Sequence, residues 1–365
     1  MKRVLINGDR ACLPIDGINR VLLEMTGSLD AIAGKDEYVL VVPSNVNEEF
    51  SDRIKEYKNI KIKKTILPYF RFWTFLFVDL AGLLLRRRVI SFRNRNSVFG
   101  GGINMLQDII PLRFYGSRDR KYLKGIGRLL YTSDSLIVAS EFTRKDIEKA
   151  VKSGLINEGR RKRRKPKDLE QPRIQVIRLG WQHYLEIQED PEIFNEYPCI
   201  KKGEYYFSLS GISPHKNLRF IYEAAERYPD RMFVVAGAMN RGYGYEHKPL
   251  KNLFFVGRIS DPRAKALMMN CRAFIFPSLY EGAGLPPLEA LSCNVPVMAA
   301  DIEVIHEYCG DSVHYFDPYD HDTDFDAVLK TDVSAPEEAL CKLSWDRAAQ
   351  ELKKIIESCR KEQAV

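Results

Sequence analysis

The chain has 365 residues and carries 56 Lys and Arg against 49 Asp and Glu, which gives a net charge of +7. Seven of the basic residues lie within 160–167, and the remainder holds 49 residues of each sign. This excludes a protein that is basic throughout, such as a histone-like coat. A chain of this length with 45% apolar residues is typical of a globular protein with two cores.

The first half alternates short apolar runs with helical patterns. We expect strands at 2–7, 38–42, 59–65, 88–92, 103–107, 135–139 and 174–178. We expect helices at 17–33, 46–57, 70–87, 118–131 and 141–152. This alternation predicts a parallel sheet with right-handed crossovers.

One stretch of this half, 72–85, is strongly apolar and ends in Arg86, Arg87 and Arg88. Its 14 residues include Asp79 and are too few to span a bilayer. The pattern fits a mostly buried helix, or else a helix at a membrane surface with an arginine edge.

The alternation resumes after polar residues 182–203. We expect strands at 205–209, 232–236, 253–256, 273–276, 295–298 and 313–316. We expect helices at 217–227, 262–270, 286–293 and 303–308, and a charged helical tail. The chain therefore divides into two Rossmann-like α/β domains, with parallel sheets that we expect to face each other across a cleft. The boundaries are 1–185 with a basic insertion at about 157–172, a linker at 186–203, a second domain at 204–343, and a helix at 344–365 that could cross back to the first domain.

Ligands of such sheets bind beyond the carboxyl ends of the strands, so the loops that follow strands are the most informative. Residues 277–289 follow the run AFIF and precede a helix. Gly282 and Gly284 let a ligand approach backbone amides, while Glu281 and Glu289 can accept bonds from sugar hydroxyls. Alternatively, Glu289 only complements the helix dipole and Glu281 is solvated.

Two further loops have the same placement. In 210–217, Gly211, His215 and Lys216 stand at a helix start, where they could hold a diphosphate or form a surface turn capped by Asn217. In 256–260, Gly257 and Arg258 could present backbone and a cation to a nucleobase.

Together these loops resemble the family 4 (group 1) glycosyltransferases of the GT-B fold. The segment 278–290 resembles the E-x7-E signature of that family, with Ala283 where an aromatic residue is common. The segments 211–217, 295–301 and 315–320 continue the resemblance, with His215 in the place of an arginine. In the first half, 16–20, 107–113 and 139–144 also resemble family segments.

The resemblance implies roles for residues at matching positions. Glu289 would bind the ribose, while Glu281 with the backbone around Ala283, Gly284 and Leu285 would hold the transferred sugar. Lys216, and less securely His215, would neutralise the diphosphate, Arg258 would lie beside the base, and Gly17 would let the first helix approach the diphosphate. Gln107 and Asp108 match the His-Asp pair of the family, and Gln107 cannot act as a base because an amide does not titrate.

The function that follows is that of a metal-independent, retaining hexosyltransferase without a cofactor. Its partners would be a GDP- or UDP-linked sugar, with mannose as the first choice, and a glycan or lipid-linked acceptor of surface polysaccharide or lipopolysaccharide synthesis. Scattered cysteines without a C-x-x-C pair and an N-terminus without a long apolar run favour the cytoplasm. The sequence Asp322-Thr-Asp324 is interpreted as a solvated loop rather than a metal site.

Other interpretations stay open at this point. The fold would also suit a nucleotide-sugar epimerase or an inactive homologue. A glycoside hydrolase using Glu281 and Glu289 is disfavoured by the phosphate-type loops. Nucleic-acid binding by 160–167 is disfavoured because that tract has no interleaved aromatic residues.

The basic tract is either a solvated loop or a cationic contact to anionic lipid at the inner face of the membrane. For the lipid contact, the candidate residues are Arg86, Arg87, Arg88, Arg160, Arg161, Lys162, Arg163 and Arg164.

Overall fold

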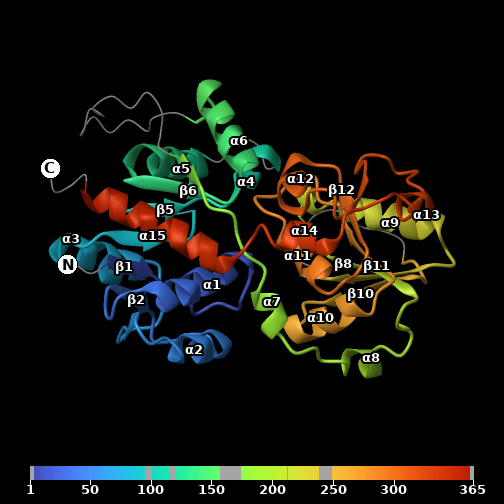
Figure 1. Cartoon of the computed structure of the whole chain (residues 1–365), viewed down its shortest axis with the longest axis horizontal. Helices are drawn as coiled ribbons and strands as arrows, with labels where there is room; N and C mark the ends of the chain where they lie inside the picture. Colours follow the sequence, from blue (N-terminus) through green and yellow to red (C-terminus); the bar gives the residue numbers. More distant parts are fainter. Residues whose placement is uncertain are drawn as a thin grey trace. The chain divides into compact units, whose positions relative to one another are not determined.

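The computed structural model describes residues 4–94, 101–114, 120–156, 174–211, 213–237 and 249–361. The chain forms two compact units (Figure 1). Unit 1 holds Met1–Leu179 and Trp345–Val365, and unit 2 holds Gly180–Ser344. The segment 186–203, expected as a linker, therefore belongs to unit 2, and the tail helix belongs to unit 1.

Unit 1 is built on a seven-stranded sheet in the order β3-β2-β1-β4-β5-β6-β7, and every pairing is parallel. Its strands are β1 (Val4–Asn7), β2 (Tyr38–Val42), β3 (Lys61–Lys64), β4 (Val89–Ser91), β5 (Ile103–Met105), β6 (Ser135–Val138) and β7 (Ile174–Val176). Its helices are α1 (Gly17–Ile32), α2 (Glu48–Lys55), the π-helix η1 (Phe75–Asp79), α3 (Leu80–Leu84), α4 (Ile110–Phe114), α5 (Arg120–Thr132), α6 (Glu141–Lys152) and α15 (Trp345–Lys361).

Unit 2 repeats this plan with a six-stranded parallel sheet in the order β10-β9-β8-β11-β12-β13. Its strands are β8 (Tyr205–Leu209), β9 (Met232–Ala236), β10 (Leu253–Gly257), β11 (Ala273–Phe276), β12 (Val297–Ala300) and β13 (His314–Phe316). Its helices are α7 (His183–Glu186), α8 (Ile193–Glu196), the 3-10 turn η2 (Pro214–Lys216), α9 (Leu218–Arg227), α10 (Asp261–Met269), α11 (Leu285–Ser292), α12 (Glu303–Cys309), α13 (Phe325–Val328) and α14 (Pro336–Leu340).

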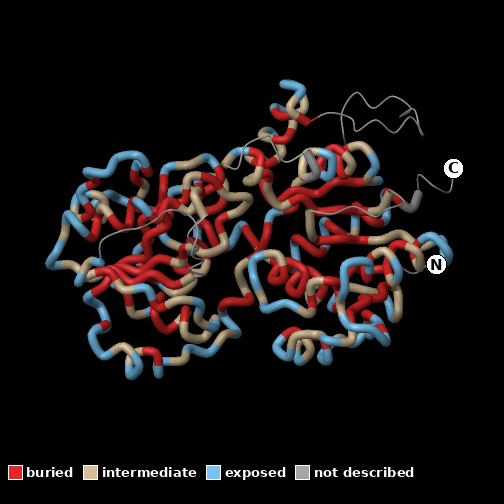
Figure 2. Tube along the Cα trace, turned by 180° about the vertical axis from the view of Figure 1, so that it is seen from behind, coloured by how far each residue is buried: buried red, intermediate tan, exposed pale blue. Residues whose placement is uncertain are grey.

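The two sheets form the most buried part of each unit (Figure 2). All residues of β2 and β11 are buried, as expected when helices cover both faces of a parallel sheet. In both units the strand order reverses beside the first strand: between β1 and β4, and between β8 and β11. The two Rossmann-like parallel sheets predicted from the sequence are thus confirmed.

The C-terminal helix α15 completes unit 1 by packing along α1 (Figure 1). Its buried residues include Trp345, Leu352 and Ile356, which follow the spacing of one helix face. Lys353 donates through Nζ to the carbonyl of Ile32, 2.7 Å away, which ties the two helices at the end of α1.

The helix expected over 70–87 is shorter and less regular. The π-helix η1 runs into α3, which ends at Leu84. Gly82 allows the following turn, because a Cβ there would lie 2.8 Å from Val89 Cγ2.

Arg88 departs from the expected role in lipid binding. Its side chain is only 8% exposed, and it donates to Asp134 Oδ2 at 3.0 Å and to the carbonyl of Cys359 at 3.0 Å. The lipid contact expected of Arg88 is therefore corrected to a structural role within unit 1.

The tract 160–167, including Arg160–Arg164, lies outside the described residues. Among the described helices, none has the length and apolarity needed to cross a membrane.

Candidate functional site

The reversal of strand order in unit 2 brings the loops after β8 and β11 together. Leu279 donates its backbone N–H to the carbonyl of His215 at 2.7 Å. Lys216 Nζ lies 2.7 Å from Glu281 Oε1. These residues are 65 positions apart in sequence, and the sheet order makes them neighbours. The Lys216 and Glu281 side chains are 25% and 12% exposed, so both are accessible to a ligand while held by the protein.

Asn217 sets the geometry of the first loop. Its backbone is left-handed, with φ of 52°, a conformation that asparagine tolerates better than most residues. Its Nδ2 donates to the carbonyl of Pro318 at 2.9 Å, which fixes the turn before α9. Gly237 follows β9 and packs directly against this loop. A side chain has no room there, because a Cβ would lie 2.2 Å from the carbonyl oxygen of Ser210, next to Gly211.

The second loop ends at α11, where the chain packs tightly. Gly284 precedes the helix, and a Cβ on it would lie 3.1 Å from Ile305 Cδ1 and 3.4 Å from Tyr308 Cβ. This packing explains a small residue at 284 without reference to a ligand. Gly282, Ala283 and Leu285 are partly exposed around the helix start, where the helix dipole favours negative charge.

Glu289 lies in α11, and a residue that the sequence did not single out holds its carboxylate. His183 Nε2 lies 3.1 Å from Glu289 Oε1. The imidazole is almost fully buried, while the carboxylate keeps 13% of its surface exposed. Since the His183 contact occupies one oxygen of Glu289, the carboxylate is oriented and can accept further hydrogen bonds. Only the isolated histidine in the polar segment 182–203 could have drawn attention to this contact.

His215 differs from its expected role as a second cation. Its side chain is buried, and burial lowers the pKa of the imidazole to about 4. The ring is therefore neutral at pH 7, and the positive charge of this loop comes from Lys216.

Gly257 ends β10 with φ of 71° and accepts a hydrogen bond from Gly237 N at 2.8 Å. Arg258 beside it is exposed, so its guanidinium is open to a ligand.

The remaining expected site residues lie in unit 1. Gly17 begins α1, which Asp16 caps by accepting from Asn19 N, and a Cβ on Gly17 would touch nothing within 4 Å. Gln107 donates Nε2 to the carbonyl of Phe92 at 3.2 Å, and Asp108 accepts from Ile110 N at 3.0 Å.

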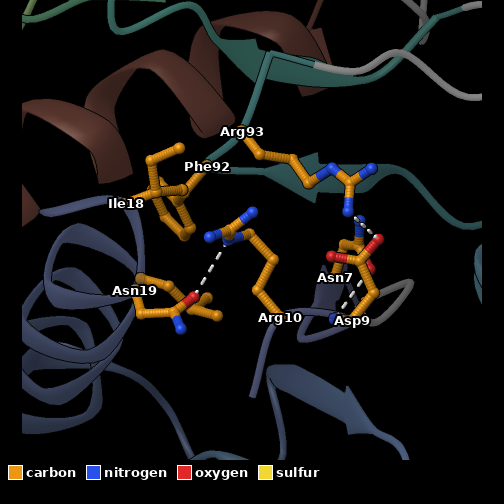
Figure 3. Close-up of a pocket in the computed structure, with 8 residues that line it drawn as sticks. Asn7, Asp9, Arg10, Ile18, Asn19, Phe92 and Arg93 are labelled. Atoms are coloured by element: carbon orange, nitrogen blue, oxygen red, sulfur yellow. Dashed lines mark hydrogen bonds and ion pairs between the residues drawn. The ribbon is translucent and has the colours of Figure 1, made fainter. Parts of the chain in front are cut away.

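A pocket that the sequence did not predict lies at the reversal of strand order in unit 1 (Figure 3). The loops after β1 and β4 contribute an arginine each. Arg93 lies 2.6 Å from the buried carboxylate of Asp9, which Thr74 also holds at 2.6 Å. Arg10 donates Nε to Asn19 Oδ1 at 3.2 Å. Phe92, Ile18 and Leu22 add an apolar wall.

The sequence Asp322-Thr-Asp324 does not contribute to either site. Asp324 caps α13 by accepting from the backbone of Asp326 and Ala327, and Asp322 is 89% exposed beside Arg227. Within the described ranges, no group of three or more His, Cys, Asp or Glu side chains is arranged to hold a metal ion.

Comparisons with known proteins agree with this geometry. Residues 189–330 match the family model "Glycosyl transferases group 1". The chain is 30% identical over 141 residues to O-antigen chain mannosyltransferase B of Escherichia coli, and 31% identical over 128 residues to O-antigen chain mannosyltransferase RfbU of Salmonella typhimurium. These matches cover 36% and 33% of this chain, but only 37% and 36% of the relatives' own length.

A solved structure extends the likeness of fold to nearly the whole chain. The crystal structure of Anabaena Alr3699/HepE in complex with UDP and glucose matches 98% of this chain and 100% of that chain, with a TM-score of 0.63 and 14% identity. At this identity the likeness concerns the fold alone. The architecture of two Rossmann-like units is that of the GT-B fold, as the sequence predicted.

Proposed function

We propose that this protein is a glycosyltransferase, because residues 189–330 match the family model of the group 1 glycosyltransferases and the chain has the GT-B fold. It transfers a mannosyl group from a GDP- or UDP-linked sugar to a glycan or lipid-linked saccharide, in the synthesis of O-antigen lipopolysaccharide or another surface polysaccharide. The observation that carries the proposal is the Lys216–Glu281 pair beside the start of α11. Two relatives named as O-antigen mannosyltransferases support the choice of sugar.

In this proposal, different residues of unit 2 bind different parts of the donor. Lys216 faces the diphosphate and stabilises the negative charge that grows as the bond from the anomeric carbon to the phosphate oxygen breaks. The backbone from Gly282 to Leu285 adds amides at the start of α11. Glu281 accepts from hydroxyls of the transferred sugar, and Glu289, held by His183, accepts from the ribose.

We place the acceptor saccharide at the mouth of the unit 1 pocket, beside the partly exposed guanidinium groups of Arg10 and Arg93, because the pocket itself has room for only about one water molecule. Arg10 and Arg93 are each held by an acceptor side chain, so the pocket offers oriented donors without a large excess of charge. The carboxylate of Asp9 is 1% exposed, so its part is to orient Arg93 rather than to contact the sugar. The acceptor hydroxyl bonds to the anomeric carbon on the face that the diphosphate leaves, its proton passes to the departing phosphate oxygen as the bond from that oxygen to carbon breaks, and the configuration is retained without a metal or cofactor.

The proposed acceptor also suggests where the enzyme works. A lipid-linked saccharide would be met at the inner face of a membrane, so we place the protein in the cytoplasm with peripheral association. The expected contact by Arg160–Arg164 stays a prediction, tested by deleting 160–167 and measuring vesicle binding.

The experiment that tests the function is a panel of nucleotide sugars in a thermal-shift assay, followed by a transfer assay with the preferred donor. A bound donor raises stability by about 2.7 kcal/mol at one hundred times its Kd. Glu289→Ala should abolish most of the shift, whereas Glu337→Ala, in the first turn of α14, should not change it. A wild-type protein that shifts with no nucleotide sugar, or a Glu289→Ala variant that shifts normally, contradicts the assignment.

The same assay separates transfer from epimerisation and from loss of activity. Transfer requires an acceptor, whereas an epimerase changes the donor sugar without one. Donor binding without either reaction, across a panel of oligosaccharide acceptors, would identify an inactive homologue.

A further inference from the structure

Unit 1 exposes an unusual concentration of apolar side chains on the crossover from β3 to β4. Of the 14 large hydrophobic residues that are exposed among the described residues, eight lie between Ile66 and Leu85. Ile66, Phe72 and Leu84 are 88%, 61% and 72% exposed. Scattered exposed apolar residues are ordinary, but such a concentration on one crossover points to an interaction surface.

The helical part of this crossover is apolar on two opposite sides. Trp73 and Val78 face inward and pack with Leu5, Val39 and Val41 of the sheet. Leu76, Leu83 and Leu84 are exposed. The outward side is therefore not needed for the core of unit 1, and a helix that is apolar all round is expected only where a second apolar phase covers it.

The exposed charges within this stretch of the chain are all basic. Between Lys61 and Arg88 the chain has seven basic residues and one acid, Asp79. Asp79 is buried, so no exposed acid interrupts this stretch, all of which the structure describes. Arg71 and Arg86 are exposed, and the Arg71 guanidinium lies 5.7 Å from the ring centre of Phe72.

We propose that this surface, residues 66–87, docks the protein on an anionic lipid bilayer. Leucine and phenylalanine side chains enter the boundary between head groups and acyl chains, and Arg71, Arg86 and Arg87 meet the lipid phosphates. The charge complementarity favours this occupant over a second copy of the chain, whose own surface would bring the same positive charge. The proposal does not depend on the identity of the sugar donor.

The test measures binding of the full chain to sedimented vesicles. Wild type should bind vesicles of phosphatidylglycerol mixed with phosphatidylethanolamine, and bind phosphatidylcholine vesicles much less. Replacing both Phe72 and Leu84 with serine should reduce the partition coefficient about tenfold or more, because their apolar area no longer leaves water. Tyr319→Ser is the matched control, since Tyr319 is 68% exposed in unit 2 and should leave binding unchanged.

A second variant tests the electrostatic part. Arg86→Gln with Arg87→Gln should weaken binding several-fold at low salt and flatten its dependence on salt. The far-UV circular dichroism and thermal unfolding of every variant should match those of wild type, which shows that unit 1 is still folded. The proposal is overturned if the Phe72/Leu84 variant binds vesicles like wild type, or if wild type binds no vesicles. A third result would also overturn it: sedimentation velocity shows that wild type is a dimer, and the Phe72/Leu84 serine variant is a monomer that still binds vesicles like wild type.

Discussion

Lys216 Nζ lies 2.7 Å from Glu281 Oε1, and this contact joins the two loops of unit 2 that follow β8 and β11. A cation and a carboxylate held so close orient each other, and a bound diphosphate sugar can engage both groups at once. In the proposed reaction, the pair would place a cation for the leaving group beside an acceptor for sugar hydroxyls before any substrate arrives.

Replacing Lys216 should affect the reaction more than binding alone. We expect Lys216→Met to lower kcat/KM by about 100- to 1,000-fold, because the charge that develops on the diphosphate is no longer stabilised. Steady-state kinetics with saturating acceptor measure this, with the exposed Lys330→Met as the control. Glu281→Gln and the double variant complete a cycle, and a coupling energy of about 0.5–3 kcal/mol is expected for groups in contact. Additive effects would show that the pair does not act as a unit.

His183 should act as a positioning residue for Glu289. A hydrogen bond to a charged group contributes about 1.5–3 kcal/mol, so we expect His183→Ala to raise the donor Kd by about tenfold or more. Turnover at saturating donor should fall less. His183→Gln keeps a donor group and should recover part of the affinity, measured by titration calorimetry. If both variants bind the donor as tightly as wild type does, the contact contributes only to packing.

His215 should make unit 2 less stable in acid. Its pKa is about 4 in the folded protein against 6.5 for an ordinary histidine. Between these values the unfolded chain binds more protons, so the free energy of unfolding falls as the pH drops through this range. One such group contributes a slope of at most about 1.4 kcal/mol per pH unit. Denaturant unfolding should show a shallower slope for His215→Asn, and the variant and wild type should have parallel profiles above pH 7. Equal slopes below pH 6 would contradict the burial of a neutral ring.

The packing of α15 on α1 should stabilise unit 1 in particular. Leu352 is fully buried, and Leu352→Ala should lower the free energy of unfolding by about 2–5 kcal/mol. Calorimetry with and without a nucleotide sugar distinguishes the unfolding transitions of the two units, because we expect the donor to raise the unfolding temperature of unit 2. Gln350→Ala, on the exposed side of the same helix, should be neutral. A loss confined to the donor-protected transition would show that α15 stabilises unit 2 instead.

The sequence by itself determined the strands, the parallel sheets and the loops that follow the strands. Each of the thirteen strands in the described part of the chain lies within or next to an expected run, because buried parallel strands are short apolar runs with clear ends. Helices of four or five residues, such as α7 and α8, were missed because they are too short to show a helical period. For the same reason, the sequence predicted a linker at 186–203, a segment that contains α8.

Only the tertiary structure decided which side chains meet. Lys216 and Glu281 are 65 residues apart, and Asp9 and Arg93 are 84 residues apart. Strand order creates both contacts, and no local pattern encodes strand order. Burial is equally non-local: it makes His215 neutral and commits Arg88 to Asp134, although both look like free cations in the sequence. Local periodicity thus specified the elements, and the chemistry of each site arose from the neighbours that folding brought to them.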